Sequence, residues 1–317
     1  MKDTISQITI PTPFAVGDTH MYLLKGDRLS LIDAGVKTEQ AWEACQQQLK
    51  EHGYGPEDIE QIILTHHHPD HIGLIEQFPR AESMIAHKNV DLWLTRDEPF
   101  FQRYTQFFKY VFTAGGIPEY LHGFLDHIRA PLQFSGKGKL TSVLEEGDYL
   151  PGHEDWQVIE TKGHAQSHLS FFREIDGAFI AGDHLLYHIS PNPLMEPPIN
   201  PKEERPKPML GYRHNLKKCL HLGINTVYPG HGEIFNEAEE IIAKRLRSQE
   251  KRAEKVLHLL KEKSQTPFQL CRQIFPSRYE NQIDLTMSET IGQLDYLEDE
   301  GLIGKRLEGE YIYFYIK

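Results

Sequence analysis

The sequence predicts an α/β fold, and two observations support this prediction. Short apolar runs that end near glycine or proline alternate with segments of helical spacing before residue 90 and again after residue 145. Histidine and aspartate side chains follow several of these runs directly, at the place where α/β proteins assemble their sites. The chain has 317 residues, which is enough for about two domains.

Three runs in the N-terminal third are expected as strands: ISQITIPTPF, HMYLLKG and LSLIDAG. Residues 38–52 are expected as a helix, because Trp42, Cys45 and Leu49 recur at helical spacing. A further strand, IEQIILT, leads directly into the segment HHHPDHIG, and residues 72–78 are expected to form a short helix.

Residues 90–145 are rich in aromatic side chains, and Phe100, Tyr104, Phe107 and Phe108 recur at helical spacing. We expect an inserted pair of helices with a small core of its own. A second interpretation, in which this segment roofs a pocket, is compatible with the first.

The alternation resumes with three expected strands: WQVIETKGH, SHLSFFRE and GAFIAGDHLL. The prolines between Leu185 and Pro208 predict a loop, because they exclude a central strand or a continuous helix. A helix up to Leu222, a strand in NTVYPGHG and a long helix over residues 236–263 are expected next.

From Thr266 the pattern predicts two helices and a β-hairpin with its turn at Glu308-Gly309. We therefore expect a larger domain over residues 1–240, with the insertion at about 90–145, and a smaller domain over residues 241–317.

The composition narrows the classes of protein. A net charge of -12 disfavours non-specific binding to nucleic-acid backbones. The first residues, MKDTISQITI, show neither a signal peptide nor a membrane span. Three widely spaced cysteines argue against a disulfide scaffold and are typical of a reducing compartment, so we expect a cytoplasmic protein.

The segment HHHPDH concentrates groups that bind metals. Because successive side chains of a strand point to opposite faces, His66 and His68 share one face, while His67 points to the other and is not counted as a ligand. The following turn can bring Asp70 and His71 beside them. Divalent cations would make this crowding of polar groups favourable.

Three more ligand-type residues follow short apolar runs, each next to a glycine: His164, Asp183 and His231. Glycine lets the backbone turn sharply, so these side chains can converge. Imidazole and carboxylate without thiolate suit zinc, iron or manganese, and the whole set exceeds what one ion needs. We therefore expect two divalent metal ions, with zinc preferred.

This set resembles the metallo-β-lactamase superfamily over about residues 5–240, because it contains the signature H-x-H-x-D-H and the later ligands in family order. The resemblance implies an αββα sandwich with two metal sites: His66, His68 and His164 for one ion, Asp70, His71 and His231 for the other, and Asp183 bridging. It also implies hydrolysis by a metal-bridging hydroxide, with Asp70 accepting a proton as the catalytic residue.

Other positions are expected to support or line this centre. Asp33 resembles the family's buried acid that orients a ligand, and Thr65 and His168 are weaker cases of the same kind. His184 departs from many relatives, which have a small or hydroxyl residue after Gly-Asp. Tyr187 and His188 are candidate substrate contacts, and residues 90–145 and 185–208 are expected to wall the cavity.

The smaller domain over residues 241–317, here called the tail, resembles the winged-helix domain of the β-lactamase-like protein 2 group. Some members of that group cleave single-stranded RNA. The apolar spacing in IGQLDYLEDEGLI marks its core face. Acidic and basic residues nearly balance after Glu240, however, so we favour packing or homodimer formation over RNA binding.

The preferred function is hydrolysis of a small ester, thioester or lactone. A nuclease acting on single-stranded RNA is the alternative, and a binding protein with a vestigial metal site is a third hypothesis. β-Lactamase activity is disfavoured, because zinc β-lactamases generally lack the bridging aspartate. Hydroxyacylglutathione hydrolase is disfavoured because no basic cluster for glutathione stands out.

Overall fold

A computed structural model describes residues 3–317, and these form two compact units. The first, here called the sheet unit, comprises residues up to Asp97, Pro131–Pro191 and Asn215–Ile242. The second, the helical unit, comprises Glu98–Ala130, Asn192–His214 and Ala243–Lys317. Each unit is therefore built from three separate stretches of the chain.

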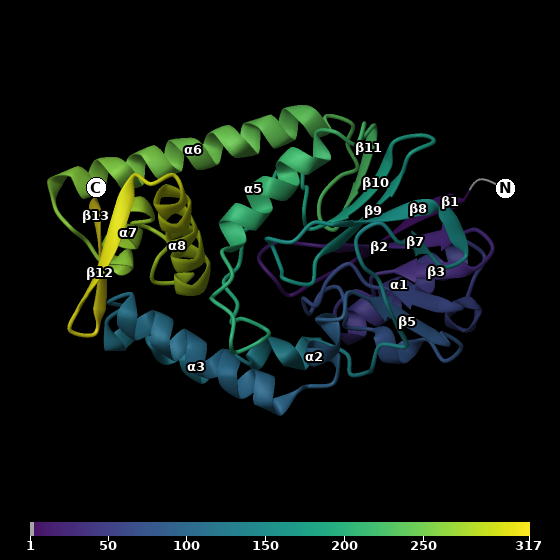
Figure 1. Ribbon diagram of the computed structural model, residues 1–317. Coiled ribbons are helices and arrows are strands. Elements are labelled where there is room, and N and C mark those ends of the chain that lie inside the picture. Colours follow the sequence, from purple (N-terminus) through teal and green to yellow (C-terminus); the bar gives the residue numbers. More distant parts are fainter. Residues whose placement is uncertain (1–2) are drawn as a thin grey trace. The chain divides into compact units, whose positions relative to one another are not determined.

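The sheet unit contains two sheets (Figure 1). One has the order β1-β2-β3-β4-β5-β6, with these bounds: Thr4–Ile10, Thr19–Lys25, Leu29–Ile32, Gln61–Ile63, Ser83–Ala86 and Ser142–Val143. The other has the order β11-β10-β9-β8-β7, with these bounds: Thr226–Pro229, Ala178–Gly182, Leu169–Arg173, His153–Glu160 and Tyr149–Leu150. Pairing is parallel from β3 through β6 and between β10 and β11, and antiparallel elsewhere.

The two sheets share one buried core. Tyr22, Leu24 and Ile32 of the first sheet lie in the same cluster as Trp156 and Phe171 of the second. A separate cluster joins the opposite face of the first sheet to α1 (Glu39–Glu51), through residues such as Leu31 and Leu49. Two apolar faces on one sheet explain why its central strands are apolar at consecutive positions. The predicted α/β fold is confirmed.

Short helices complete the sheet unit: η1 (Pro56–Asp58), η2 (Ile75–Gln77), α2 (Val90–Leu94) and most of η4 (Ala130–Phe134). Arg96, after α2, donates hydrogen bonds to the carbonyl oxygens of Leu132, Ser135 and Gly136 at 3.0–3.1 Å. This one guanidinium therefore joins the two ends of the segment that leaves the sheet unit at Asp97 and returns at Pro131.

The helical unit has the following elements: α3 (Glu98–Ala114), η3 (Glu119–Leu121), α4 (Gly123–Asp126), part of α5 (Pro208–Cys219), most of α6 (Ala238–Glu262), α7 (Pro267–Ile274), α8 (Ile283–Asp299), β12 (Ile303–Glu308) and β13 (Tyr311–Ile316). Figure 1 shows α7, α8 and the β12–β13 hairpin of this unit near the C-terminus. The predicted order of two helices and a hairpin is thus present, but its description as a winged helix stays a prediction.

The aromatic segment does not have a core of its own, so that expectation was wrong. Phe108 and Phe112 of α3 are buried in one cluster with Phe268 of α7 and Met287 of α8. Helical spacing identified the buried face of α3, but it carries no information about which distant helix covers that face.

Three local boundaries also differ from expectation. Strand β4 ends at Ile63, so the histidine segment is loop rather than strand. The short helix expected over residues 72–78 is only η2. The hairpin turn is Gly309-Glu310, one residue later than predicted, because Glu308 pairs with Tyr311 and Gly309 has φ +62°. None of the helices among residues 3–317 is long and apolar enough to cross a membrane.

Candidate metal centre

The first four ligand candidates come from the loop after β4. Because this loop is not a strand, side-chain alternation does not explain why His66 and His68 meet, and that argument was wrong. The loop nevertheless brings Nε2 of His66 to 2.9 Å from Nδ1 of His68. Asp70 and His71 lie in the turn that follows, and both side chains are buried.

Three loops of the second sheet deliver the remaining candidates. His164 follows β8, Asp183 follows β10 directly, and His231 follows β11. Nε2 of His164 lies 2.9 Å from Nδ1 of His68, so a loop of one sheet meets a loop of the other. The centre therefore sits where loops from the two sheets converge.

The ligand atoms fall into two groups, in each of which all atoms lie within 4.8 Å of one another: His66, His68, His164 and Asp183, and Asp70, His71 and His231. Asp183 faces both groups. Its Oδ1 lies 3.4 Å from Nε2 of His71, and its Oδ2 lies 3.4 Å from Nε2 of both His164 and His231. This placement matches a carboxylate shared by two ions.

The hydrogen bonds around the histidines leave the facing nitrogens available for metal. Nδ1 of His231 donates to the carbonyl oxygen of Asp18 at 2.7 Å, and Nδ1 of His71 donates to Asp33 at 2.7 Å. Each ring can thus present an unprotonated Nε2 to a metal ion. Within residues 3–317, the buried Nε2 of His71 and Oδ1 of Asp183 have no hydrogen-bond partner, as expected of atoms that bind a cation.

Asp33 is the anchor of the first loop. Its carboxylate accepts hydrogen bonds from the backbone N–H of Thr65 at 2.7 Å, from the Thr65 hydroxyl at 2.8 Å, and from Nδ1 of His71. Since the hydroxyl of Thr65 donates to Asp33, its oxygen accepts from Nδ1 of His66 at 3.0 Å. One buried carboxylate therefore orients two ligand rings. Asp33 itself has φ +61°, a conformation rarely adopted by residues other than glycine, asparagine and aspartate.

His168 holds the backbone next to Asp183. Its Nε2 accepts a hydrogen bond from the N–H of Asp183 at 3.0 Å, so its proton is on Nδ1 and is donated to the hydroxyl of Thr161 at 2.8 Å. Thr161 in turn donates to Ser170, and Ser170 donates to the carbonyl oxygen of Ala181. This chain of hydrogen bonds begins at the N–H of Asp183, directly after β10, and ends at the carbonyl oxygen of Ala181 in β10.

The electrostatic environment divides the histidines into two kinds. Burial, reinforced by neighbouring imidazoles, lowers the pKa of His66 and of His68 well below 6.5. Burial alone would also lower the pKa of His71 and His231, but the surrounding carboxylates, Asp183 first, outweigh it. They raise the pKa of His71 well above its usual value and that of His231 to about 10. In the metal-free protein, protons on these two rings balance the buried carboxylates.

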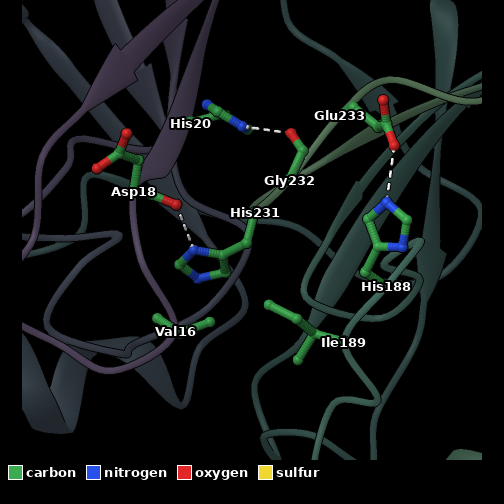
Figure 2. A pocket seen from close by; sticks show the side chains of 8 residues that line it. All are labelled: Val16, Asp18, His20, His188, Ile189, His231, Gly232 and Glu233. Carbon is green, nitrogen blue, oxygen red and sulfur yellow. Dashed lines mark hydrogen bonds and ion pairs between the residues drawn. The ribbon is translucent and has the colours of Figure 1, made fainter.

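A pocket opens beside His231 in the sheet unit. Figure 2 shows Val16, Asp18 and His20 on one side of this pocket, His188, Ile189 and Glu233 on the other, and His231 between them. Nε2 of His188 lies 2.8 Å from Glu233, and the ring of Tyr187 packs against Phe235 rather than lining the pocket. His188 and Ile189 lie in the segment 185–208 that was expected to wall the cavity, whereas Val16 and His20 were missed, because no ligand motif includes them.

Two other expectations concern His184 and His67. His184 is fully buried beside His168 and is not among the pocket's lining residues, and burial lowers its pKa to about 3. His67 is not part of either ligand group. Residues 98–130 and 192–208 belong to the helical unit, so their expected role as walls of the cavity stays a prediction.

A family model supports the assignment that this geometry suggests. The model described as "Metallo-beta-lactamase superfamily" matches residues 15–231, which is more than half of the chain. The chain belongs to the metallo-β-lactamase superfamily. The matched residues include all the ligand candidates, from His66 to His231.

Individual proteins that resemble this chain in sequence agree with its membership of this superfamily. The "Probable metallo-hydrolase YqjP" of Bacillus subtilis (strain 168) is 41% identical over 313 residues, 99% of this chain and 98% of that protein. The "Beta-lactamase-like protein 2 homolog" of Caenorhabditis elegans is 24% identical and covers 83% of this chain and 72% of its own length. This likeness is too distant to confirm the grouping expected from the tail.

A shorter match and one solved structure complete the comparison. The "N-acyl homoserine lactonase AttM" of Agrobacterium fabrum is 27% identical over 117 residues, 37% of this chain and 42% of that protein. A metallo-beta-lactamase family protein from Thermus thermophilus has a TM-score of 0.82 at 25% identity, covering 99% of this chain and 98% of its own. The superfamily fold is therefore confirmed.

Replacing Gly230 with alanine is expected to weaken metal binding by about tenfold or more. A Cβ at this position would lie 2.2 Å from Oδ1 of Asp183 and 2.9 Å from Cε1 of His71, so the carboxylate must move. Metal content after dialysis, measured by elemental analysis, tests this. Gly123→Ala is the control, because a Cβ there meets nothing within 4 Å. Equal metal content in G230A and wild type would contradict the geometry.

Metal binding is expected to release protons at pH 7, because His71 and His231 must lose theirs to bind. The direction of the pH dependence follows from the raised pKa values of His71 and His231. The protonated rings stabilise the metal-free fold fully below 6.5, and this stabilisation is lost as pH rises toward about 10 for His231. Metal affinity should therefore fall as the pH is lowered from 8 to 6. Calorimetry in two buffers of different ionisation enthalpy measures the release, and a heat independent of the buffer would contradict it.

Proposed function

We propose that this metal-dependent hydrolase cleaves a small ester, thioester or lactone at a centre of two divalent metal ions. The observation that carries the proposal is the pair of ligand groups joined by Asp183, with an open pocket beside His231. The match to a lactonase over part of the chain supports an acyl substrate. The identity of the metals is part of the proposal: histidine and carboxylate ligands favour zinc over softer ions.

The metal ions would supply water ionised near neutral pH and polarisation of the acyl oxygen. The chain's own residues then have three tasks. The bridging carboxylate of Asp183 sets the separation of the two groups, and Asp33 fixes the rings that face them. Asp70, with its Oδ2 3.3 Å from Nε2 of His231, is the proposed proton acceptor.

The surroundings of Asp70 suit this task. In the metal-free protein, burial alone would raise the pKa of its carboxyl group, but His71 and His231 lower it below the ordinary value, so the carboxylate is ionised before metal ions bind. Its side chain is also nearly buried, which keeps bulk water from competing for it.

The size and lining of the pocket favour a small molecule. Its volume is about 400 Å³, within the range typical of small-ligand sites. Val16 and Ile189 offer apolar contact, while the exposed side chains of His188 and Glu233 are hydrogen-bonded to each other at the same pocket. We propose that Val16 and Ile189 contact the acyl part of the substrate and that His188 contacts its polar part.

Cleavage of single-stranded RNA is the second candidate, favoured by the order of two helices and a hairpin in the tail. The charges of the tail argue against it. Lys305 lies 2.9 Å from Glu298, and Arg306 and Arg252 form ion pairs with Glu308 and Glu289. Basic groups already paired with acids neutralise few phosphates. We therefore propose that the tail, winged helix or not, serves packing or formation of a homodimer.

Purified protein is expected to contain close to two transition-metal ions per chain, because the ligand set exceeds what one ion needs. Asp183→Ala should lower the occupancy of both sites, since this carboxylate faces both groups. Elemental analysis of wild type and D183A measures this. A protein that binds no metal even after reconstitution, or a variant that loses only one ion, would contradict the bridging role.

The substrate class is tested by screening the metal-loaded enzyme against esters, thioesters, lactones, phosphodiesters and single-stranded RNA. We expect turnover of an acyl substrate, loss of about 100-fold or more in kcat for Asp70→Ala, and a rise in KM for Ile189→Ala with little change in kcat. Ile175→Ala, at an exposed position outside the pocket, is the matched control. Tight RNA binding with steep salt dependence, together with cleavage that D70A abolishes, would instead establish the nuclease.

A further inference from the structure

His67 lies between two metal-ligand candidates but contacts a different partner. Its Nδ1 is 2.7 Å from the hydroxyl oxygen of Ser167, and both side chains are buried, with exposed fractions of 2% and 0%. Ser167 is three residues after His164, in the loop between β8 and β9. This hydrogen bond therefore connects the loop that carries His66 and His68 to the loop that carries His164.

The ring of His67 is also held from its face. It stacks on Trp93 of α2, with ring centroids 4.1 Å apart and planes at 12°. Trp93 packs against the apolar cluster under the first sheet, so it is itself fixed. A hydrogen bond in the ring plane and a stacking contact on the ring face together define the position and tilt of the imidazole.

We propose that His67 is a positioning residue that sets the separation of the two loops and thereby the metal affinity of the group formed by His66, His68 and His164. Within that group, Nδ1 of His68 and Nε2 of His164 lie 2.9 Å apart and come from the two loops that His67 joins. This inference rests on the proposed metal centre and adds a residue that is not a ligand.

The second group is held by contacts that do not include His67, although Asp33 also reaches His66 of the first group through Thr65. His71 is held by Asp33, and His231 is held by the carbonyl oxygen of Asp18. Neither support passes through His67 or Ser167. Loss of the His67 contact should consequently weaken the binding of one metal ion much more than that of the other, whereas a general loss of packing would weaken the binding of both.

The test is titration of the metal-free full-length protein with Co²⁺, followed by the visible absorption of the bound ion and by calorimetry. His67→Phe keeps a ring to stack on Trp93 but loses the hydrogen bond, and Ser167→Ala removes the partner hydroxyl. Each should weaken the binding of one Co²⁺ ion by about 10- to 100-fold, the range typical of non-ligand residues that support a metal site, and alter the absorption spectrum of that ion. The other Co²⁺ should bind within about threefold of wild type.

Further variants separate positioning from folding. The double variant H67F/S167A should lose no more affinity than either single variant, because both remove the same bond. His67→Asn can restore a hydrogen bond to Ser167 and should bind more tightly than H67F. His153→Phe is the control: this buried histidine contacts Asp3 and Ser30, so the change should lower thermal stability and leave Co²⁺ affinity unchanged.

The outcomes separate this inference from the proposed function. If wild type binds no Co²⁺, the metal centre itself is refuted. If wild type binds two ions and H67F and S167A bind them equally well, or lose both ions alike, the positioning role is overturned and the metal centre stands. A selective loss that S167A reproduces and that H67N relieves supports the proposal.

Discussion

Asp183 brings one buried carboxylate within 3.4 Å of ring nitrogens on His71, His164 and His231, which come from three different loops. Packing alone would not favour such an arrangement, because it removes ionisable groups from water. It becomes favourable when positive charge is shared among them, either as protons on imidazole or as bound cations. The whole centre depends on this compensating positive charge. In the metal-free protein it is supplied by protons on His71 and His231, whose pKa values are raised.

The two-sheet scaffold makes this convergence possible. Ligand loops leave the ends of β4 in one sheet and of β8, β10 and β11 in the other, and the core between the sheets fixes those ends. Polar residues then refine the positions. Asp33 orients rings of the first loop, His168 orients the backbone of Asp183, and His67 joins loops of the two sheets. Apolar packing therefore places the loops, and directional hydrogen bonds place the ligands.

The proposed hydrolysis of a small molecule is consistent with these features together. The pocket adjoins a ligand of the second group and combines apolar with paired polar side chains. The tail instead buries its apolar side chains in a core that includes Val256 and Leu260 of α6 and Leu294 of α8. Several of its basic side chains are paired with acids. A surface of that kind suits protein packing better than recognition of a phosphate backbone.

The sequence by itself determined the α/β fold and which side chains are candidate metal ligands, because strand periodicity is local and the candidate motif is contiguous or flanked by glycine. It did not determine why His66 and His68 meet, since β4 ends at Ile63 and a loop brings the two rings together. Nor could it show that Phe112 packs against tail helices or that His67 bonds to Ser167. Those pairings join residues that lie far apart along the chain. Only the topology decides them, because each side chain is compatible with many buried partners until the sheets and helices have packed.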